Sequence, residues 1–202
     1  MATEELVLPH VLPRERVPLA SQVRGTVVLA SLRGLRSRGH GERYMAMLDP
    51  KYHPVVESLT AGIWLPMDFA LAHYDTCEAL ALDRQTIEDI GAESGRFINQ
   101  TVLTVMAKLS TESGVTPWFV LGYANKLAAR TWVGSSLALW KRGPKEARLE
   151  WIQQPVARVP YFRLAFGAFT EAICRMFAKT VYVREIPGRV RPTEAAYRIS
   201  WV

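Results

Sequence analysis

The sequence contains few of the cysteine and histidine residues that many catalytic and metal sites use. Only two of its 202 residues are cysteines, Cys77 and Cys174, and only four are histidines. The two cysteines do not form a CxxC pair, so a disulfide framework is excluded. A phosphate-binding loop, a dinucleotide fingerprint, and the His-Glu-x-x-His and Gly-x-Ser-x-Gly motifs are also missing. These absences predict no catalytic residues, no metal site and no cofactor.

Long apolar runs and an export signal are missing too. Charges or prolines interrupt each apolar segment before it reaches the ~18 residues of a membrane span. The first 22 residues carry Glu4 and Glu5 where a signal peptide would be basic, followed by Pro9, Pro13 and Pro18. The sequence therefore predicts a soluble, cytoplasmic protein with no transmembrane segment and with reduced cysteines.

The overall composition is that of a globular domain. Hydrophobic residues make up 49% and charged residues 22%, and no stretch resembles a linker. The prolines fix their own φ angles and disfavour helix before them. We expect an extended N-terminal arm over residues 1–22 and one α+β ligand-binding-like domain over residues 23–202.

Helical periodicity dominates the first two thirds of the chain. Val28, Leu32 and Leu35 recur at i, i+4 and i+7, which predicts a helix over 23–36. The same reasoning predicts further helices over 42–48, 55–60, 67–82, 84–109 and 117–130.

The last third alternates with a period of two. This pattern predicts strands over 135–141 and 146–152, and again over 180–186 and 195–202. Between the two pairs, Phe162, Phe166 and Phe169 form a helical stripe within a predicted helix over 161–179. The expected fold is α+β, with N-terminal helices packed on a C-terminal four-stranded antiparallel sheet in the order strand-strand-helix-strand-strand.

Several segments carry a family resemblance. They are Val23 to Thr26, Gly91 to Thr101, Phe162 to Phe177 running into Val181 to Val183, and Ala196 to Trp201. From about Val23 onward the chain resembles a myxobacterial paralogous family of uncharacterised domains. That family is distantly similar to the superfamily of heme–nitric-oxide-binding sensors, 4-vinyl-reductase-type small-molecule-binding domains and certain vesicle-tethering subunits. The resemblance implies helices packed on an antiparallel sheet around a pocket, often with dimerisation.

The chain departs from the heme sensors of that superfamily in two places. They carry an axial histidine on the helix before the sheet, and residues 117–130 contain no histidine. They also use a Tyr-x-Ser-x-Arg motif for the heme propionates, and the nearest stretch, Trp151 to Pro155, has none of these three residues. A heme-type gas sensor is therefore kept only as an alternative function.

A second alternative is an enzyme that uses Cys77 and His73. The two residues are four apart and share a helix face, so both could act as metal ligands or as a nucleophile and its base. A structural zinc site needs four ligands, and Asp75 projects from another side of the helix. We expect a buried thiol beside a histidine instead.

The net charge of +6 and the pI near 9.5 raise the question of an anionic partner. Two basic clusters stand out: Arg33, Arg36, Arg38 and Arg43, and then Lys141, Arg142, Lys145 and Arg148. No nucleic-acid-binding motif accompanies them, so nucleic acid is not a favoured partner.

Aromatic residues concentrate where the last N-terminal helix meets the sheet. A pocket at this junction would have aromatic walls and a few polar groups. The predicted ligand-binding residues are Trp118, Tyr123, Lys126, Arg130, Trp132 and Trp151. The leading hypothesis is a non-catalytic sensor or regulatory module in signalling. It binds a small apolar ligand, or pairs with itself as a homodimer or with another protein.

The alternation of Tyr197, Ile199 and Trp201 predicts that the chain end is a structural strand. Losing a large buried aromatic costs ~3–5 kcal/mol, against a total stability of ~5–15 kcal/mol for a domain. Deleting the last six residues should therefore unfold or aggregate the protein. A soluble truncated chain with an unchanged melting temperature would contradict the strand assignment.

Overall fold

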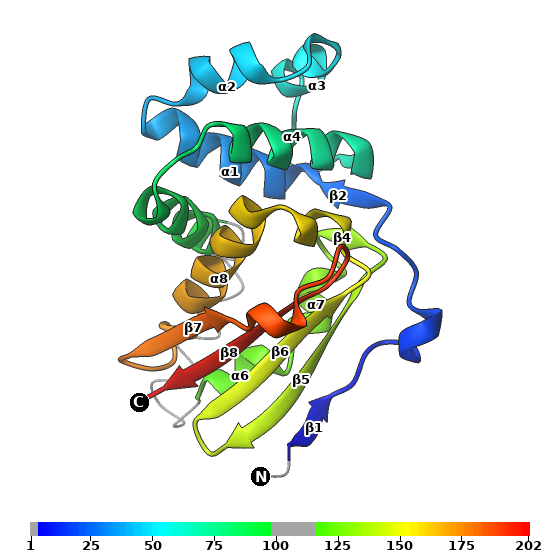
Figure 1. Cartoon of the computed structure of the whole chain (residues 1–202), viewed down its shortest axis with the longest axis vertical. Helices are drawn as coiled ribbons and strands as arrows, with labels where there is room; N and C mark the ends of the chain where they lie inside the picture. The colour runs from blue at the N-terminus through cyan, green and yellow to red at the C-terminus, as the bar shows by residue number, and fades with distance from the viewer. Residues whose placement is uncertain (1–3, 98–115) are drawn as a thin grey trace.

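The computed structural model describes residues 4–97 and 116–202, which form a helical layer and a sheet layer with one long helix between them (Figure 1). The helical layer holds α1 (Gly25–Ser37), α2 (Gly41–Met47), α3 (His53–Glu57) and α4 (Met67–Ala79), and a further helical segment covers residues 84–97. Helix α8 (Pro160–Cys174) runs between the layers, while α6 (Pro117–Leu121) and α7 (Ala124–Ala128) lie against the sheet.

The larger sheet has five strands, all antiparallel, in the order β1-β5-β6-β8-β7. They are β1 (Glu5–Leu8), β5 (Ser136–Gly143), β6 (Glu146–Ile152), β7 (Val181–Glu185) and β8 (Ala195–Trp201). The strand pairs that flank α8 follow the predicted segments closely. The predicted count of four was wrong, because β1 of the N-terminal arm adds to the free edge of β5.

A second, three-stranded sheet was also not predicted. It joins β2 (Gln22–Arg24) to β3 (Trp64–Pro66) and β4 (Trp132–Val133). These strands are only two or three residues long, too short for an alternating pattern to stand out in the sequence. Gly134 follows β4 with a φ of +88°, and a Cβ there would lie 2.5 Å from the carbonyl oxygen of Leu19. This position therefore requires glycine.

The apolar face of each main element lies in the core, as its periodicity predicts. Val28, Leu32 and Leu35 of α1 are buried, and Leu149 and Trp151 of β6 face the helices. The predicted helix over 117–130 divides into α6 and α7 at a turn. The predicted helix over 84–109 is helical as far as residue 97, and the rest of it lies outside the described residues.

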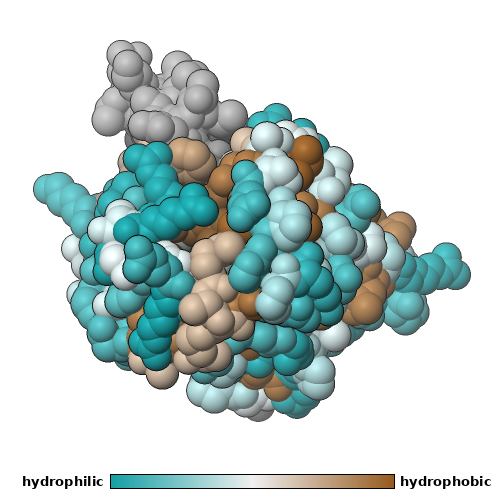
Figure 2. All heavy atoms as spheres, turned by 90° about the horizontal axis from the view of Figure 1, so that it is seen from above, coloured by the Kyte–Doolittle hydropathy of each residue, from teal (hydrophilic) through white to brown (hydrophobic). Residues whose placement is uncertain are grey.

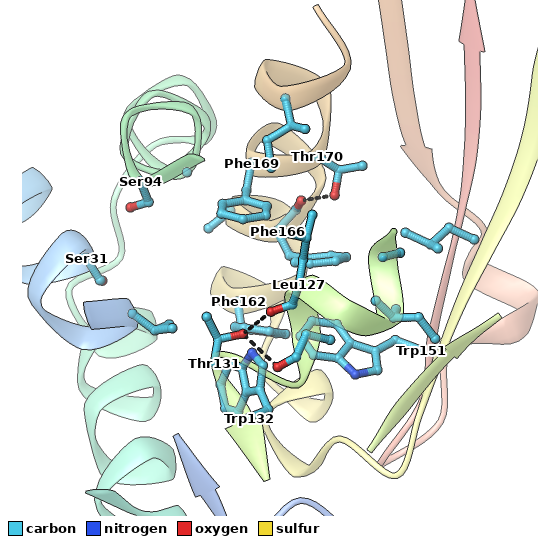
Figure 3. Close-up of a pocket in the computed structure, with 18 of the residues that line it drawn as sticks. Ser31, Ser94, Leu127, Thr131, Trp132, Trp151, Phe162, Phe166, Phe169 and Thr170 are labelled. Atoms are coloured by element: carbon cyan, nitrogen blue, oxygen red, sulfur yellow. Dashed lines mark hydrogen bonds between the residues drawn. The ribbon is translucent and has the colours of Figure 1, made fainter. Parts of the chain in front are cut away.

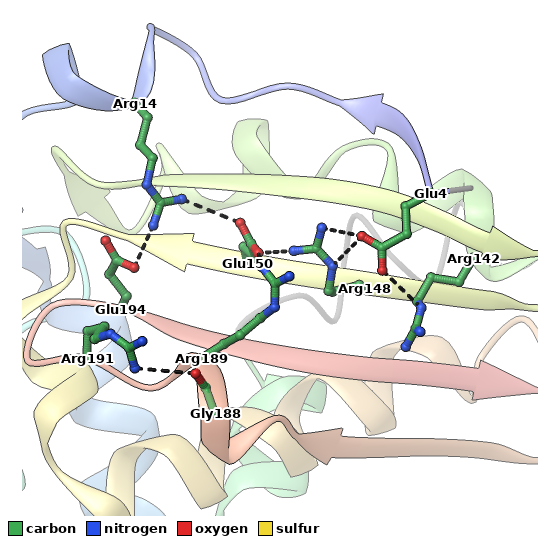
Figure 4. A network of polar contacts seen from close by, with 9 residues as sticks. All are labelled: Glu4, Arg14, Arg142, Arg148, Glu150, Gly188, Arg189, Arg191 and Glu194. Atoms are coloured by element: carbon green, nitrogen blue, oxygen red, sulfur yellow. Dashed lines mark hydrogen bonds and ion pairs between the residues drawn. The ribbon is translucent and has the colours of Figure 1, made fainter. Parts of the chain in front are cut away.

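The N-terminal arm is bound to the outer face of the sheet by ion pairs at two places along its length (Figure 4). Near β1, Glu4 accepts hydrogen bonds from Arg148 at 2.6 Å and 3.0 Å and pairs with Arg142 at 3.1 Å. Arg148 is only 4% exposed, and its guanidinium stacks 4.0 Å above the ring of Trp140. The hydrogen bond from Arg148 holds the pKa of Glu4 below its ordinary value.

Farther along the arm, Arg14 provides the second attachment. It lies 2.5 Å from Glu194 and 3.5 Å from Glu150. The buried Glu150 also pairs with Arg148 and with Arg189. Because Arg148 and Glu150 point away from the helices, the sequence alone suggests that they face solvent. The arm and its arginines bury them instead.

The helical segment 84–97 crosses α8 at very close range. A Cβ at Gly91 would lie 2.1 Å from the carbonyl oxygen of Ala165, and one at Gly95 would lie 3.0 Å from that of Phe169. Backbone therefore packs on backbone at this crossing. These glycines, which weaken a helix in isolation, are what allow the two helices to touch.

Replacing Gly91 by alanine should therefore destabilise the protein, although alanine is the better helix former. We expect a loss of about 1–3 kcal/mol from overpacking and a fall in melting temperature of roughly 3–10 °C, measured by thermal denaturation. Gly62→Ala is the matched control, because a Cβ there meets nothing within 4 Å. Equal melting temperatures for the two variants would contradict the close crossing.

Candidate ligand-binding cavity

A cavity of about 130 Å³ lies between the two layers, beside α8 (Figure 3). Its wall is built by α1, α4, the helical segment 84–97, α6, α7, α8 and the inner face of the sheet. The lining residues are Val27, Ser31, Tyr74, Ile90, Gly91, Ser94, Val120, Leu121, Ala124, Leu127, Ala128, Thr131, Trp132, Leu137, Leu149, Trp151, Tyr161, Phe162, Ala165, Phe166, Phe169, Thr170, Ile173 and Cys174. None of these carries a charge.

Aromatic rings form one side of the wall. Phe162, Phe166 and Phe169 follow one another along α8, with successive ring centroids 6.0 Å and 5.9 Å apart and nearly parallel planes. Trp151 comes from β6 and lies 4.6 Å from the ring of Phe166. Trp132 of β4 meets Trp151 edge to face at 5.7 Å. The two periodicities, helical in α8 and alternating in β6, turn these rings toward the same space.

Three hydroxyl groups in the wall are already bonded to backbone. Ser94 donates to the carbonyl of Ile90 at 2.8 Å and Thr170 donates to that of Phe166 at 2.9 Å. Thr131 lies 3.0 Å from the carbonyl oxygen of Ala128. These side chains therefore behave as apolar surface toward the cavity.

One corner of the cavity is polar and leads into a buried hydrogen-bond chain. Ser31 of α1 lies 3.0 Å from Nε2 of His73 on α4, and Nδ1 of that histidine lies 2.8 Å from the hydroxyl of Tyr44 on α2. The sulfur of Cys77 lies 3.7 Å from the same Nε2. The hydroxyl of Tyr161, at the start of α8, is buried in this corner. Its polar neighbours there are the hydroxyl of Ser31 and the thiol of Cys77.

Burial keeps the groups of this corner uncharged. It lowers the pKa of His73 to about 3, so the imidazole is neutral at physiological pH. It raises the pKa of the Cys77 thiol and of the Tyr161 hydroxyl, and it raises that of the Cys174 thiol to about 12. Neither cysteine is a thiolate in the folded protein, and the phenol keeps its proton.

The structure separates the sequence-predicted ligand-binding residues into two groups. Trp132 and Trp151 line the cavity. Trp118 instead packs on Trp201 at 5.1 Å, with its indole N–H donating to a backbone carbonyl. Tyr123, Lys126 and Arg130 are exposed, with the Lys126 ammonium above the Tyr123 ring at 5.1 Å.

Sequence reasoning paired His73 with Cys77 but missed Ser31 and Tyr161, which complete the polar corner. Ser31 and Tyr161 are far apart in the chain, and neither belongs to a motif. The signal that existed was the phenylalanine stripe of α8, which begins one residue after Tyr161. That stripe predicts the helix over 161–179, but not the cavity beside it.

His73 and Cys77 do share a helix face, as predicted, but they lack the third member of a catalytic set. Asp75 projects outward and pairs with Arg158. No group of three or more metal-ligating side chains occurs in the part of the chain that the structure describes. A neutral imidazole next to a protonated, buried thiol provides no activated nucleophile.

The basic clusters are partly neutralised within the fold. Arg38 and Arg33 lie 2.8 Å and 4.0 Å from Glu93, and Arg142 and Arg148 pair with Glu4. At the helical end of the molecule, hydrophilic and hydrophobic side chains are interspersed (Figure 2). No helix within residues 4–97 and 116–202 is long and apolar enough to cross a bilayer.

This architecture matches solved structures over most of the chain. An Fe(II) unliganded H-NOX protein from K. algicida superposes with a TM-score of 0.63, at 9% identity, over 89% of this chain and 96% of that one. The chain has the H-NOX fold. A T. tengcongensis H-NOX mutant gives a TM-score of 0.58 at 13% identity, covering 88% of this chain and 97% of that one. An oxygen-binding H-NOX domain related to soluble guanylate cyclases gives 0.55 at 13% identity, over 88% and 94%.

Comparison of the sequence with known families and proteins identifies no relative. No family model matches the chain, and no curated protein matches it in sequence. Identities of 9–13% establish the fold alone. The chemistry of the cavity must therefore be read from the residues that line it.

The residues present do not fit heme, the group that is the subject of other matching structures, one of them a study of heme distortion in the H-NOX family. None of the four histidines lines the cavity, and His73, behind the wall, has both ring nitrogens hydrogen-bonded. The thiol of Cys174 and the phenol of Tyr161 are held in their protonated forms, which are poor iron ligands. Because the wall has no cation within residues 4–97 and 116–202, heme propionates would be buried without a partner there. The 130 Å³ volume is also well below the ~300–1,000 Å³ of usual cofactor sites.

The burial of His73 predicts how the stability of the protein depends on pH. The unfolded chain binds a proton at His73 below about pH 6.5, whereas the folded chain does not bind it until about pH 3. Stability from this group is therefore present above pH 6.5 and is lost as the pH falls, by up to ~1.4 kcal/mol per pH unit.

Urea unfolding of the wild type and of His73→Gln between pH 7 and pH 4.5 measures this effect. The variant should be less stable at pH 7 but should lose less stability on acidification than the wild type. Parallel pH profiles for the two proteins would show that His73 does not titrate differently in the folded state.

Proposed function

We propose that this chain is a non-catalytic module that binds a small, neutral, apolar molecule in the cavity between its two layers. The observation that carries the proposal is the wall itself. It combines tryptophan and phenylalanine rings with aliphatic side chains, and none of the described residues that form it is charged. A charged ligand would lose its hydration there and gain no partner.

The size of the cavity sets the size of the ligand. At about 130 Å³ it is comparable to the ~150 Å³ apolar cavity that is known to hold benzene. Burying about 200 Å² of apolar ligand surface at ~25 cal/mol/Å² is worth about 5 kcal/mol, which corresponds to a Kd on the order of 0.1–1 mM. A larger ligand would require the layers to separate.

The position of the cavity supports a sensor or regulatory role. Its wall draws on both layers and on α8, so a bound molecule contacts all three at once. Filling the cavity would strengthen the contact between the layers. Such a ligand changes the relative stability of two arrangements, which is what a sensor requires.

Benzene tests the proposal directly. We expect benzene near 5 mM to raise the melting temperature of the wild type by a few degrees, because ligand at about 10 Kd stabilises by ~1.4 kcal/mol. Ala128→Leu, which adds a side chain to the cavity wall, should abolish the shift while preserving the circular dichroism spectrum. Ala129→Leu is the matched control, since Ala129 is exposed and does not line the cavity.

Two outcomes would overturn the proposal. One is a melting temperature that benzene does not change in any of the three proteins. The other is a sharp Soret band on hemin addition that Ala128→Leu removes, which would assign the cavity to heme. Native mass spectrometry of the purified protein reports any retained ligand and the number of subunits in the same spectrum. It therefore also tests whether the protein associates with itself.

A further inference from the structure

The N-terminal arm holds a histidine ring against the outer face of the larger sheet. The ring of His10 meets that of Trp140 on β5 nearly edge to face, with the two centroids 6.2 Å apart. Neither ring nitrogen reaches solvent, and no side chain within the described part of the chain forms a hydrogen bond with either of them. The backbone of Leu137 is a polar neighbour of the ring, and its carbonyl also accepts a hydrogen bond from Asn125 at 2.8 Å.

The charges around His10 favour the neutral ring. Burial lowers the pKa of the imidazole, and the nearby guanidinium of Arg14 on the same arm lowers it further. On the sheet side, Arg148 stacks on the same tryptophan that the histidine contacts. Glu194 acts in the opposite direction, but both it and Glu150 already pair with Arg14. A proton added to the ring would therefore be buried among arginines.

Polar contacts, and not the burial of apolar side chains, hold residues 4–16 on the sheet. None of these residues is fully buried. The attachments are the ion pairs of Glu4 and Arg14, the N–H of Val11 bonded to a serine hydroxyl of β5 at 3.0 Å, and a short β1–β5 ladder that a bulge interrupts. The first fully buried residue of the arm is Val17. The segment before it can therefore leave the sheet without opening the core.

We propose that residues 4–16 are a pH-sensitive strap, which lies closed along the edge of β5 while the His10 imidazole is neutral and detaches when that ring takes up a proton. In the detached arm the ring is hydrated and has its ordinary pKa of about 6.5. The attachment is therefore at full strength above about pH 6.5 and weakens as the pH falls. Its equilibrium constant changes by at most about tenfold per pH unit.

Detachment would uncover one edge of the larger sheet, because β1 is the strand that lies beside β5 there (Figure 1). It would also uncover Arg148 and Glu150, whose partners Glu4 and Arg14 belong to the arm. An unpaired strand edge can take up another strand. The strap thus controls access to this edge, and it does so whatever the cavity binds.

The ion pair at the start of the arm does not respond in the same pH range. The hydrogen bond from Arg148 holds the pKa of Glu4 below its ordinary value, so this carboxylate stays ionised between pH 7 and pH 5.5. The arginines stay protonated throughout. A change in the attachment of the arm over this range therefore reports on His10.

Hydrogen exchange measured by NMR at pH 7 and pH 5.5 tests the strap, since it detects openings that are too rare to alter a spectrum. The reporters are the N–H of Val11 and the β1 amides that bond to β5. After correction for the intrinsic pH dependence of exchange, their protection factors in the wild type should fall together, several-fold. Amides of β8, which pairs with β6 and β7 and not with the arm, give the baseline.

Two variants remove the titrating group in different ways. His10→Gln keeps a neutral polar side chain, and His10→Phe keeps a ring against Trp140 in case glutamine loosens the arm at both pH values. In each, the protection factors should be the same at pH 7 and pH 5.5. His40→Gln is the matched control, because His40 precedes α2 in the helical layer, and it should keep the wild-type response.

Three results would overturn the proposal. The first is wild-type protection of the arm that acidification leaves unchanged. The second is an equal fall in the His10 variants, which would assign the response to another group. The third is a fall confined to Val11 while the β1 amides keep their protection, because residues 4–16 would then not move as one strap.

Discussion

Helix α8 is the element on which the rest of the structure depends, because it contacts both layers at once. Its phenylalanines meet Trp151 and the inner face of the sheet, while its backbone at Ala165 touches Gly91 of the helical layer. The close crossing at Gly91 fixes the distance between the layers. The phenylalanine rings of α8 are flat and nearly parallel, and the crossing at Gly91 holds the helical layer at a set distance from them. Side chains do not fill the space that is left between them. The cavity follows from these two constraints.

The polar groups at one corner of the cavity lie in a single buried cluster. A buried hydroxyl without an acceptor is disfavoured by ~1–3 kcal/mol, and most proteins avoid it. Here the hydroxyl of Tyr161 lies beside Ser31 and Cys77. The hydrogen-bond chain behind it, through Ser31 and His73 to Tyr44, ties the same corner to three helices of the helical layer.

The H-NOX fold and the chemistry of its cavity are separate properties. The chain aligns with H-NOX structures over nearly nine tenths of its length, although the identity is about a tenth. The shared property is the arrangement of layers, which depends on apolar periodicity that many sequences satisfy. The wall of this cavity has no histidine, no cation and no ionised thiol among its described residues. A single fold therefore hosts different sites.

The sequence by itself determined the elements whose pattern repeats over several turns or residues. The phenylalanine stripe of α8, the Val28–Leu35 face of α1 and the alternation in β5, β6 and β8 each placed an element and its buried face. Trp132 and Trp151 were predicted as ligand-binding residues because aromatic residues concentrate where the last N-terminal helix meets the sheet. Local periodicity carries this information because it depends only on neighbours along the chain.

Only the tertiary structure decided what depends on contacts between distant segments. The pairing of β1 with β5, the burial of Arg148 beneath the arm and the meeting of Ser31 with Tyr161 join residues from opposite ends of the chain. No local pattern marks them, since a strand of four residues or a single serine looks the same wherever it packs. The site lies in this second group. Its apolar wall follows from periodicity, but its polar corner exists because α1, α4 and α8 bring Ser31, His73 and Tyr161 together from distant parts of the chain.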